Sequence, residues 1–526
     1  MSCNLMFSEY LKKARLNGNV WIADVREEFN SSSQIPFEVK LKLTLLDNNE
    51  REFRLHLPDY SDEGEKKLLT DYISASLYNI LAAVGGRRYE FIYDEENDKL
   101  NSLIFEVNNR FKPEIRGYGK IIRENQRISS HISFDGKTVE KRNLPEYLRK
   151  TVSDAQKGVR AGIDVGGTDI KLAVSKDGIL AGTLEYDWNP SVFKTGDEFV
   201  RPVIELAKKL LGMAGAEKFD GIGLSFPDVC IFDKICGGET PKTLGIHNNS
   251  DVDYEREFKK ISDLGAALKE LCIENGEIHI VNDGSVAAFA AGVELAFKGD
   301  DELISDGVFS YALGTSFGSG WIDENGDVPP IPQEFYDSII DIGSYESGLF
   351  AARDLRSTVS EASGFQGVDR YVGQAAAFRY AYDINPSLLD GFIEENNGML
   401  KIISEPSDMR KLCLEHLMRL AKSGNEDAKA VFLKIGECLG QVSREVEYLL
   451  QPESDMRYIF GRFAKYPEIF SLLKEGHKKT MPKLELIAAD DGLAFSPLMV
   501  QLAKKRDITV AQFGQAIGAI YLSAKK

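Results

Sequence analysis

The stretch DVGGTDIK, residues 164–171, lies between two short apolar runs, Ala161 to Ile163 and Leu172 to Val174. This pattern predicts a strand, a tight turn and a second strand. Gly166 and Gly167 give the turn its backbone freedom and carry no side chain that would block a ligand, and free amides in such a turn can bind a phosphate. An ordinary β-hairpin with a glycine turn is the alternative, because short glycine motifs often match by chance.

A second stretch of the same kind, YALGTSFGSGW, occupies residues 311–321. It predicts a strand, a turn at Gly314, Thr315 and Ser316, and a returning strand. Two such hairpins, about half a globular domain apart, indicate a duplicated unit in which two phosphate-binding turns face each other across a cleft.

A candidate base lies between the two hairpins in the segment VNDGS, residues 281–285, which precedes an alanine-rich helix over 286–295. Asp283 stands at this strand-to-helix junction, where its carboxylate can reach into the cleft. The alternative is that Asp283 caps the helix, and the two roles are compatible. Asp164, at the end of the first strand, can face a phosphate-bound Mg²⁺ through water.

In this order the segments resemble the superfamily of sugar kinases, hexokinases, actin and the Hsp70 ATPases, and within it the ROK (repressor, ORF, kinase) family. The long helical segment 421–453 and the Gly/Ala-rich segment 513–523 agree with that family too, so the resemblance covers residues 158–526. It implies an α/β fold: a duplicated RNase H-like (actin-like ATPase) fold of two lobes with a cleft, preceded by a small α+β domain. The implied domains are 1–150, 158–300 and 301–526.

The resemblance also implies roles for single residues. Asp283 would be the general base, and Asp164 would bind Mg²⁺ through water. The implied ligand-binding residues are Gly166, Gly167, Thr168, Gly314, Thr315 and Ser316 for the phosphates of ATP, Gly461 for adenosine, and Ser225, Asp228, Asn282 and Asp283 for the substrate.

The chain departs from the family pattern after the second hairpin. Residues 327–355 contain no His and no Cys, so no structural zinc is expected there. Glu334 either contacts the sugar or is a solvated loop residue. The usual Gly-Gly pair of the adenosine site is replaced by Gly461-Arg462-Phe463, in which Arg462 or Phe463 could stack on adenine or narrow its pocket.

Residues 1–150 lie outside the resemblance. Alternating apolar residues predict strands over 37–45 and 53–57, a helix is expected over 65–83, and two further strands are expected over 89–93 and 103–107. The region lacks the basic recognition helix of a DNA-binding domain. A packing or oligomerisation role and a substrate-gating or protein-binding role both stay open, and residues 136–160 are expected to connect this region to the rest.

The composition restricts the partners. The 526 residues carry a net charge of −18, which argues against nucleic acid. No apolar stretch approaches the length of a membrane span, no signal peptide is recognisable, and six scattered cysteines are typical of reduced thiols, so we expect a cytoplasmic protein that could form a homodimer.

These features favour an ATP-dependent kinase that phosphorylates a hydroxyl of a hexose or a similar sugar, with ATP as co-substrate and Mg²⁺ as cofactor. Two alternatives use the same fold. One is a non-catalytic regulator that senses a sugar or a nucleotide, and the other is an ATPase that needs no acceptor.

Overall fold

The computed structural model describes residues 12, 18–31, 36–115, 117–132, 141–314, 317–343, 347–350, 367–403, 409–488 and 494–525. Thr315 and Ser316, both predicted to bind phosphate, lie outside the described residues. Among the helices that are described, none is long and apolar enough to cross a membrane.

The first lobe is built on a five-stranded sheet. Its strands, in spatial order, are β10 (Cys272–Asn282), β7 (Phe219–Phe226), β4 (Val159–Val165), β5 (Asp169–Lys176) and β6 (Ile179–Asp187). The hairpin partners β4 and β5 are antiparallel, whereas β4 pairs parallel with β7, and β7 with β10. The predicted hairpin therefore forms, with its turn at residues 166–168.

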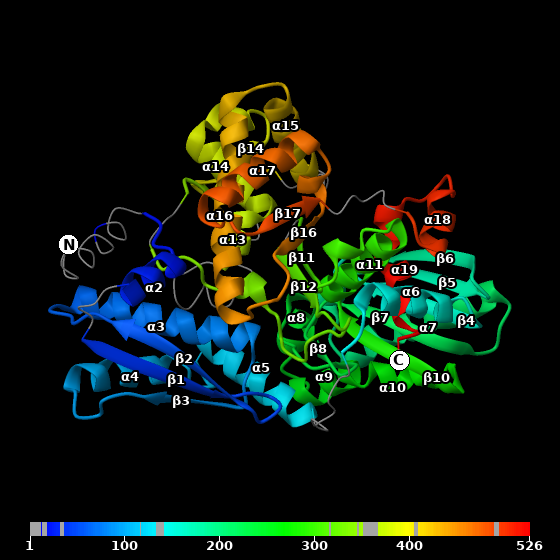
Figure 1. The fold of residues 1–526 in the computed structure, drawn as a ribbon, viewed down its shortest axis with the longest axis horizontal. Helices are drawn as coiled ribbons and strands as arrows, with labels where there is room; N and C mark the ends of the chain where they lie inside the picture. Colours follow the sequence, from blue (N-terminus) through cyan, green and yellow to red (C-terminus); the bar gives the residue numbers. More distant parts are fainter. Residues whose placement is uncertain are drawn as a thin grey trace.

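The second lobe repeats this order in a smaller sheet. Its strands are β12 (Phe317–Ile322), β11 (Val308–Leu313), β16 (Met456–Phe460) and β17 (Glu485–Ala488). The pairing is again antiparallel within the hairpin and parallel in the two following pairs. The repeated strand order confirms the predicted duplicated, RNase H-like fold with two lobes (Figure 1).

Helices cover both faces of the first sheet. Ala161 and Ile163 of β4 belong to an apolar cluster with α7 (Gly196–Ala214), and the intervening Gly162 faces α19 (Val510–Leu522). A side chain at Gly162 would collide with the α19 backbone, which explains why glycine stands there. The predicted closing helix is thus confirmed, and it packs on the first lobe.

Other helices lie between or beside the sheets. The helix α11 (Asp283–Lys298) contacts β11, β12 and α19, so it joins the two lobes. Four helices pack together beside the second sheet, at the top of Figure 1. They are α14 (Gln374–Ile384), α15 (Met409–Lys422), α16 (Glu426–Leu449) and α17 (Pro467–Thr480). Of these, α15 and α16 follow one another closely in the chain.

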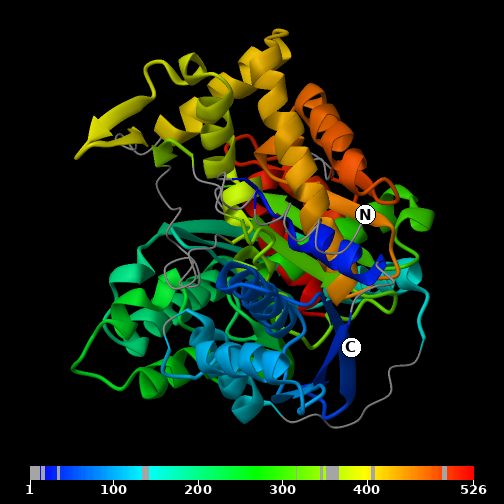
Figure 2. The ribbon, with the colours of Figure 1, turned by 90° about the vertical axis from the view of Figure 1, so that its left-hand side faces the viewer.

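The N-terminal region is an α+β unit, shown in blue in Figures 1 and 2. Its three-stranded antiparallel sheet has the order β2-β1-β3. The elements are α2 (Ile22–Ser31), β1 (Phe37–Thr44), β2 (Glu50–Leu57), α3 (Glu63–Ala83), β3 (Arg88–Ile92), α4 (Asp98–Arg110) and α5 (Tyr118–His131). The predicted strand over 103–107 is wrong, because these residues lie inside α4.

The segment 136–160, which is expected to connect the N-terminal region to the rest, is described by the structure from residue 141 onward. It contains the helix α6 (Leu144–Ala155), which is capped by the Asn143 side chain and packs against α11. Leu148 and Val152 of α6 are buried in the same apolar cluster as α19. Residues 144–155 therefore form a helix that belongs to the contact between the lobes.

The N-terminal region shares its hydrophobic core with the second lobe. One continuous apolar cluster contains Leu41 and Tyr72 from the N-terminal region and Tyr311 and Phe432 from the second lobe. A buried ion pair between Arg26 and Glu445, at 2.8 Å, crosses the same boundary. The core is thus common to both parts rather than separate for each.

Candidate active site

Three chain segments bring polar side chains to one edge of the first sheet. Because β4, β7 and β10 are parallel, their carboxyl ends meet at this edge. Asp164 pairs in register with Ser225 of β7, and the Ser225 hydroxyl donates a hydrogen bond of 2.7 Å to Asp164 Oδ1. Asp283 follows the end of β10. The structure therefore assembles Asp164, Ser225 and Asp283 as neighbours.

The charge of Asp283 acts on the Asp164 carboxylate. Burial, opposed by the Ser225 hydrogen bond and assisted by the nearby Asp283 charge, raises the pKa of Asp164 to about 6. Burial also raises the pKa of Asp283, whereas the positive charge of Lys242 and a backbone amide lower it. A carboxylate with a raised pKa accepts a proton more readily, as a general base requires.

Asn282 and Asp283 have different roles at the start of α11. The cap of this helix is Asn282, whose Oδ1 accepts the Gly284 amide at 2.9 Å, while its Nδ2 donates to the Asp228 carbonyl at 3.2 Å. Asp283 is the first residue of the helix and accepts the same amide at 2.8 Å. The alternative of Asp283 as the N-cap is therefore wrong, and its carboxylate stands at the positive end of the helix dipole.

The first turn is shaped by a tryptophan. Trp188 donates its indole N–H to the Gly166 carbonyl at 2.9 Å and its amide to the Thr168 carbonyl at 3.0 Å. Within the described part of the chain, the amides of Gly167 and Thr168 have no hydrogen-bond partner, and both residues are exposed. They can therefore donate to a phosphate. Lys171 donates to the Asp169 carboxylate, with 2.6 Å between Nζ and Oδ1.

Sequence reasoning missed Lys242. Its Nζ donates to the Pro227 carbonyl at 3.1 Å, and its Cε lies 3.7 Å from the position that a Cβ on Gly167 would take. The same ammonium acts on Asp283 and Asp228. Lys242 is thus a half-buried positive charge between the first turn and the candidate base. The sequence signal that could have identified Lys242 is a lysine in the loop directly before Thr243.

Gly461 lies beside Leu313, the last residue of β11, which directly precedes Gly314 of the predicted second turn. The Gly314 carbonyl accepts the Gln374 amide at 3.0 Å, which places the start of α14 at this turn. Gly461 adopts φ +95°, and a side chain there would collide with the Leu313 carbonyl. Gly461 therefore approaches the end of β11 closely, and its role in adenosine binding stays a prediction.

The two residues after Gly461 differ in their environment. Phe463 is fully buried against Phe432, so it cannot stack on a base, and this alternative is wrong. The Arg462 side chain is 37% exposed and lies 3.7 Å from Glu415. Of the two, Arg462 alone could reach a nucleotide.

Ser225 and Asp228, the predicted sugar contacts, are both buried and already hydrogen-bonded. Asp228 accepts the amides of Val229, at 2.7 Å, and Gly238, at 3.0 Å. It thereby fixes the loop that contains the short strands β8 (Cys230–Ile231) and β9 (Lys234–Ile235). These contacts favour a role in holding the loop, and a direct contact with a sugar stays a prediction.

Glu334 is not the solvated loop residue of the alternative interpretation. It is half-buried, and its amide donates to the Ala82 carbonyl of α3 at 3.0 Å. Burial first, and then the charges of Glu124 and Asp228, raise the pKa of Glu334 well above its usual range. The carboxyl group therefore lies close to Asp228 and to α5 of the N-terminal region.

The residues at the edge fit a magnesium ion that keeps most of its water. The described residues contain no cluster of three or more His, Cys, Asp or Glu side chains that could hold a metal by themselves. Asp164 offers one carboxylate next to the unpaired amides of the first turn. One or two carboxylates, water and phosphate oxygens are the usual ligands of Mg²⁺ at nucleotide sites.

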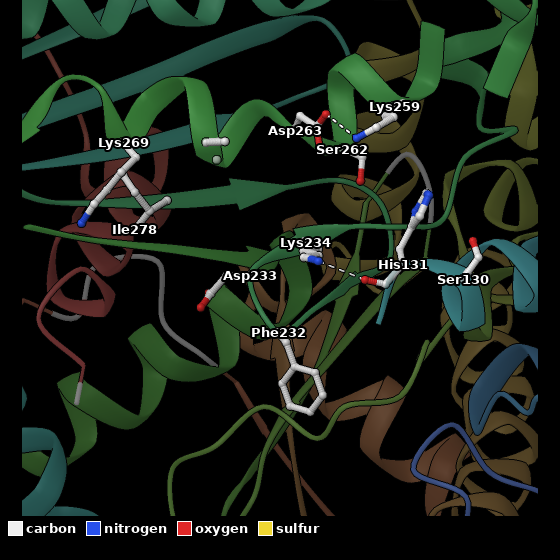
Figure 3. Close-up of a pocket in the computed structure, with 12 residues that line it drawn as sticks. Ser130, His131, Phe232, Asp233, Lys234, Lys259, Ser262, Asp263, Lys269 and Ile278 are labelled. Carbon is white, nitrogen blue, oxygen red and sulfur yellow. Dashed lines mark hydrogen bonds and ion pairs between the residues drawn. The ribbon is translucent and has the colours of Figure 1, made fainter. Parts of the chain in front are cut away.

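A separate cavity of about 570 Å³ lies between α5, the β8–β9 turn, α9 (Tyr254–Ser262) and α10 (Leu264–Lys269) (Figure 3). Its lysines are occupied: Lys234 donates to the His131 carbonyl at 3.0 Å, and Lys259 pairs with Asp263 at 2.7 Å. None of the predicted site residues lines this cavity. It is distinct from the edge that carries Asp164 and Asp283.

The repeated strand order of the two sheets defines a two-lobed protein with the actin-like fold. Several solved structures to which the chain is similar are ROK family proteins. A ROK family glucokinase from Streptomyces griseus, in complex with glucose and AMPPNP, is 16% identical with a TM-score of 0.41, and the match covers 70% of this chain and 100% of that one. A putative sugar kinase from Cytophaga hutchinsonii is 17% identical with a TM-score of 0.43, over 69% of this chain and 99% of that one.

A regulator is among the similar structures as well. A ROK family transcriptional regulator, a homologue of the E. coli MLC protein, is 13% identical with a TM-score of 0.43, over 87% of this chain and 99% of that one. No protein-family model and no curated protein matches the sequence. These weak likenesses carry no argument about substrate or activity, and the fold class rests on the strand order of the chain's own sheets.

Proposed function

We propose that the protein is an ATP-dependent kinase of the ROK type that phosphorylates a hydroxyl of a hexose or a similar sugar. The observation that carries the proposal is the position of Asp283. Its carboxylate stands at the edge of the first sheet with Asp164 and Lys242, next to a glycine turn with free amides. A sensor that only binds its ligands has no need of a base at this position.

In the proposed reaction, Asp283 accepts the proton of the acceptor hydroxyl as its oxygen attacks the γ-phosphorus of ATP. The bond from that phosphorus to the bridging oxygen breaks, and ADP leaves. Asn282 orients Asp283, because the Asn282 side chain caps α11 and also donates a hydrogen bond to the Asp228 carbonyl. The amides of Gly167 and Thr168, the Gly314 turn and Lys242 hold the phosphates and offset their charge.

Asp164 would hold the Mg²⁺ that accompanies ATP, through water, with Ser225 fixing the carboxylate. The ion would supply positive charge to the phosphate oxygens. Gly461 would leave room for adenosine. Thr315 and Ser316, outside the described residues, are proposed to complete the second phosphate turn.

The test is ADP release with Mg-ATP over a panel of hexoses, hexosamines and N-acetylhexosamines, for the wild type and Asp283→Asn. Asparagine can still accept the Gly284 amide but is not a base, so sugar-dependent kcat should fall about 10²–10⁴-fold. Asp98→Asn is the matched control, because Asp98 also follows an asparagine cap at the start of a helix and is exposed, far along the chain from the site.

The alternatives predict different results. Sugar-independent ADP release would indicate an ATPase, and binding of ATP and sugar without turnover would indicate a sensor. Unchanged kcat in Asp283→Asn would refute the role of Asp283 as base.

A further inference from the structure

Helix α5 of the N-terminal region reaches the loop that follows β7. Arg127 of α5 donates to the Gly237 carbonyl and forms ion pairs with Glu239, at 3.2 Å, and Glu255, at 2.8 Å. Arg123, one turn earlier, pairs with Glu239 at 2.7 Å. These contacts hold the backbone whose next amide, from Gly238, binds Asp228.

Apolar contacts support the same attachment. Ile128 and Ile132, from α5 and its end, are buried in one small cluster with Val229, Ile231 and Cys236 of the loop. The loop is therefore anchored to the N-terminal region on one side. On the other side, the Asp228 carbonyl accepts a hydrogen bond from the side chain of Asn282, which lies next to the candidate base Asp283.

Three carboxyl groups meet where α5 passes this loop. Glu124 of α5 is close to Asp228 and to Glu334, since the charge of Asp228 raises the pKa of Glu124, and both charges raise that of Glu334. Within the described residues, none of the three has an ion-pair partner within 4.0 Å. The nearby cations are occupied elsewhere: Lys120 pairs with Asp337 at 2.8 Å, and Arg127 pairs with the two glutamates named above.

One of these carboxyl groups lacks a hydrogen-bond partner. Glu124 is 5% exposed, and among the described residues its Oε1 has no partner. A buried carboxyl oxygen without a partner costs free energy. Such a group in a native protein therefore calls for an explanation, such as a ligand that binds it. Burial raises the pKa of Glu124 to about 7, so the group can donate as well as accept hydrogen bonds near neutral pH.

We propose that α5 completes the acceptor site, with Glu124 as a sugar-binding residue that selects uncharged sugars over sugar acids. This inference rests on the proposed function, because it deepens the description of the same acceptor site. Carboxyl groups bind hydroxyl groups by accepting and donating hydrogen bonds. A carboxylate on the ligand would instead lose its hydration beside Asp228, where Lys120 and Arg127 are already paired with other carboxylates and do not offset its charge. Arg127 is a positioning residue that holds the loop.

The experiment measures sugar binding and turnover separately. Binding of glucose, galactose, mannose and N-acetylglucosamine, and of glucuronate and galacturonate as their acidic counterparts, is measured by calorimetry without ATP. ADP release with Mg-ATP is measured on the same sugars. The variants are Glu124→Gln and Arg127→Lys, with Gln126→Ala as the control, since Gln126 is an exposed residue on the same helix.

For the neutral sugar that binds, Glu124→Gln should raise Kd and KM at least tenfold, leave the Kd for ATP unchanged, and reduce the preference over the matching sugar acid. Arg127→Lys should raise KM and also lower kcat, because the loop also contacts Asn282. Gln126→Ala should change neither constant.

Separate outcomes overturn the two proposals. Sugar-dependent turnover with an unchanged KM in Glu124→Gln would overturn the role of α5 and leave the kinase intact. Sugar binding that depends on Glu124 without any turnover would support the acceptor site and refute the kinase. Failure of the wild type to bind any of these neutral sugars, or tighter binding of a sugar acid, would overturn the role of Glu124. Should Glu124→Gln fail to fold, Glu334→Gln provides the same test from the second lobe.

Discussion

Substitution of Asp164 by asparagine should make the ligand-free protein more stable at neutral pH, even though it removes the proposed magnesium ligand. The Asp164 carboxyl has its pKa raised to about 6, chiefly by burial. Asparagine has nearly the same shape, is never charged, and its amide oxygen can still accept the Ser225 hydroxyl. The variant therefore removes the cost of burying the charge and keeps the hydrogen bond.

The size of the effect follows from the pKa. A rise from about 4 in the unfolded chain to about 6 in the folded protein corresponds to about 3 kcal/mol, because each tenfold change in proton affinity is worth about 1.4 kcal/mol. Since Asp164 is partly exposed, solvent reduces this, and we expect a gain of about 1–3 kcal/mol in the free energy of unfolding at pH 7.

The sign of the pH dependence can be worked out. Between pH 4 and 6 the folded carboxyl binds a proton more tightly than the unfolded one, so for this group the stability of the wild type falls as pH rises through that range. The advantage of Asp164→Asn should be complete above about pH 6 and should vanish below about pH 4, where both states are protonated. Other titrating groups cancel in the comparison.

The assay is urea unfolding of both proteins, followed by tryptophan fluorescence from pH 4 to 7.5 without nucleotide. Asp169→Asn is the control, because Asp169 lies in the same hairpin but forms an ion pair with Lys171 at 2.6 Å, so its loss should not stabilise the protein. A stability difference between Asp164→Asn and the wild type that is zero or independent of pH would refute the reasoning. Sugar-dependent ADP release should be strongly reduced in the same variant.

Two further predictions concern the nucleotide. Lys242→Met should lower kcat for sugar-dependent ADP release about 10–100-fold by removing the charge beside Gly167. Lys234→Met is the control, because Lys234 also donates to a backbone carbonyl but lines the separate cavity. Equal effects of the two substitutions would contradict the role of Lys242 in holding phosphate. Gly461→Ala should raise KM for ATP and destabilise the protein by about 1–3 kcal/mol, since its Cβ would meet the Leu313 carbonyl. Gly398→Ala, at φ +76° with open space around it, measures the backbone strain alone, and an equal loss of stability with an unchanged KM would contradict the steric argument.

The hairpins, the strand-to-helix junction at Asp283 and the closing helix could be predicted because their signals are local. Each depends on glycines or apolar residues within about ten positions of the chain. The wrong strand over 103–107 shows how a local signal misleads. Leu100, Leu103, Ile104 and Val107 are all buried and follow the helical spacing i, i+3, i+4, i+7, which only a longer window reveals.

The contribution of α5 to the proposed acceptor site could not be predicted from local signals. Glu124 and Glu334 are 210 positions apart, and no motif relates them. Lys120, Glu124 and Arg127 do repeat at i, i+4 and i+7 along α5, a charged stripe that is buried in the structure. Charges at that spacing normally mark a solvated helix face, so burial, which sequence does not reveal, decides their role.

The attachment of the N-terminal region limits how the cleft can open. This region shares one apolar core with the second lobe, while Arg123 and Arg127 hold a loop of the first lobe. A rigid rotation of one lobe away from the other would therefore have to rupture the arginine pairs or detach α5 from its own sheet. Because the Arg127 side chain is only 3% exposed, added salt would weaken its pairs little. The range of motion of the cleft is thus set by a helix that precedes both lobes in the sequence.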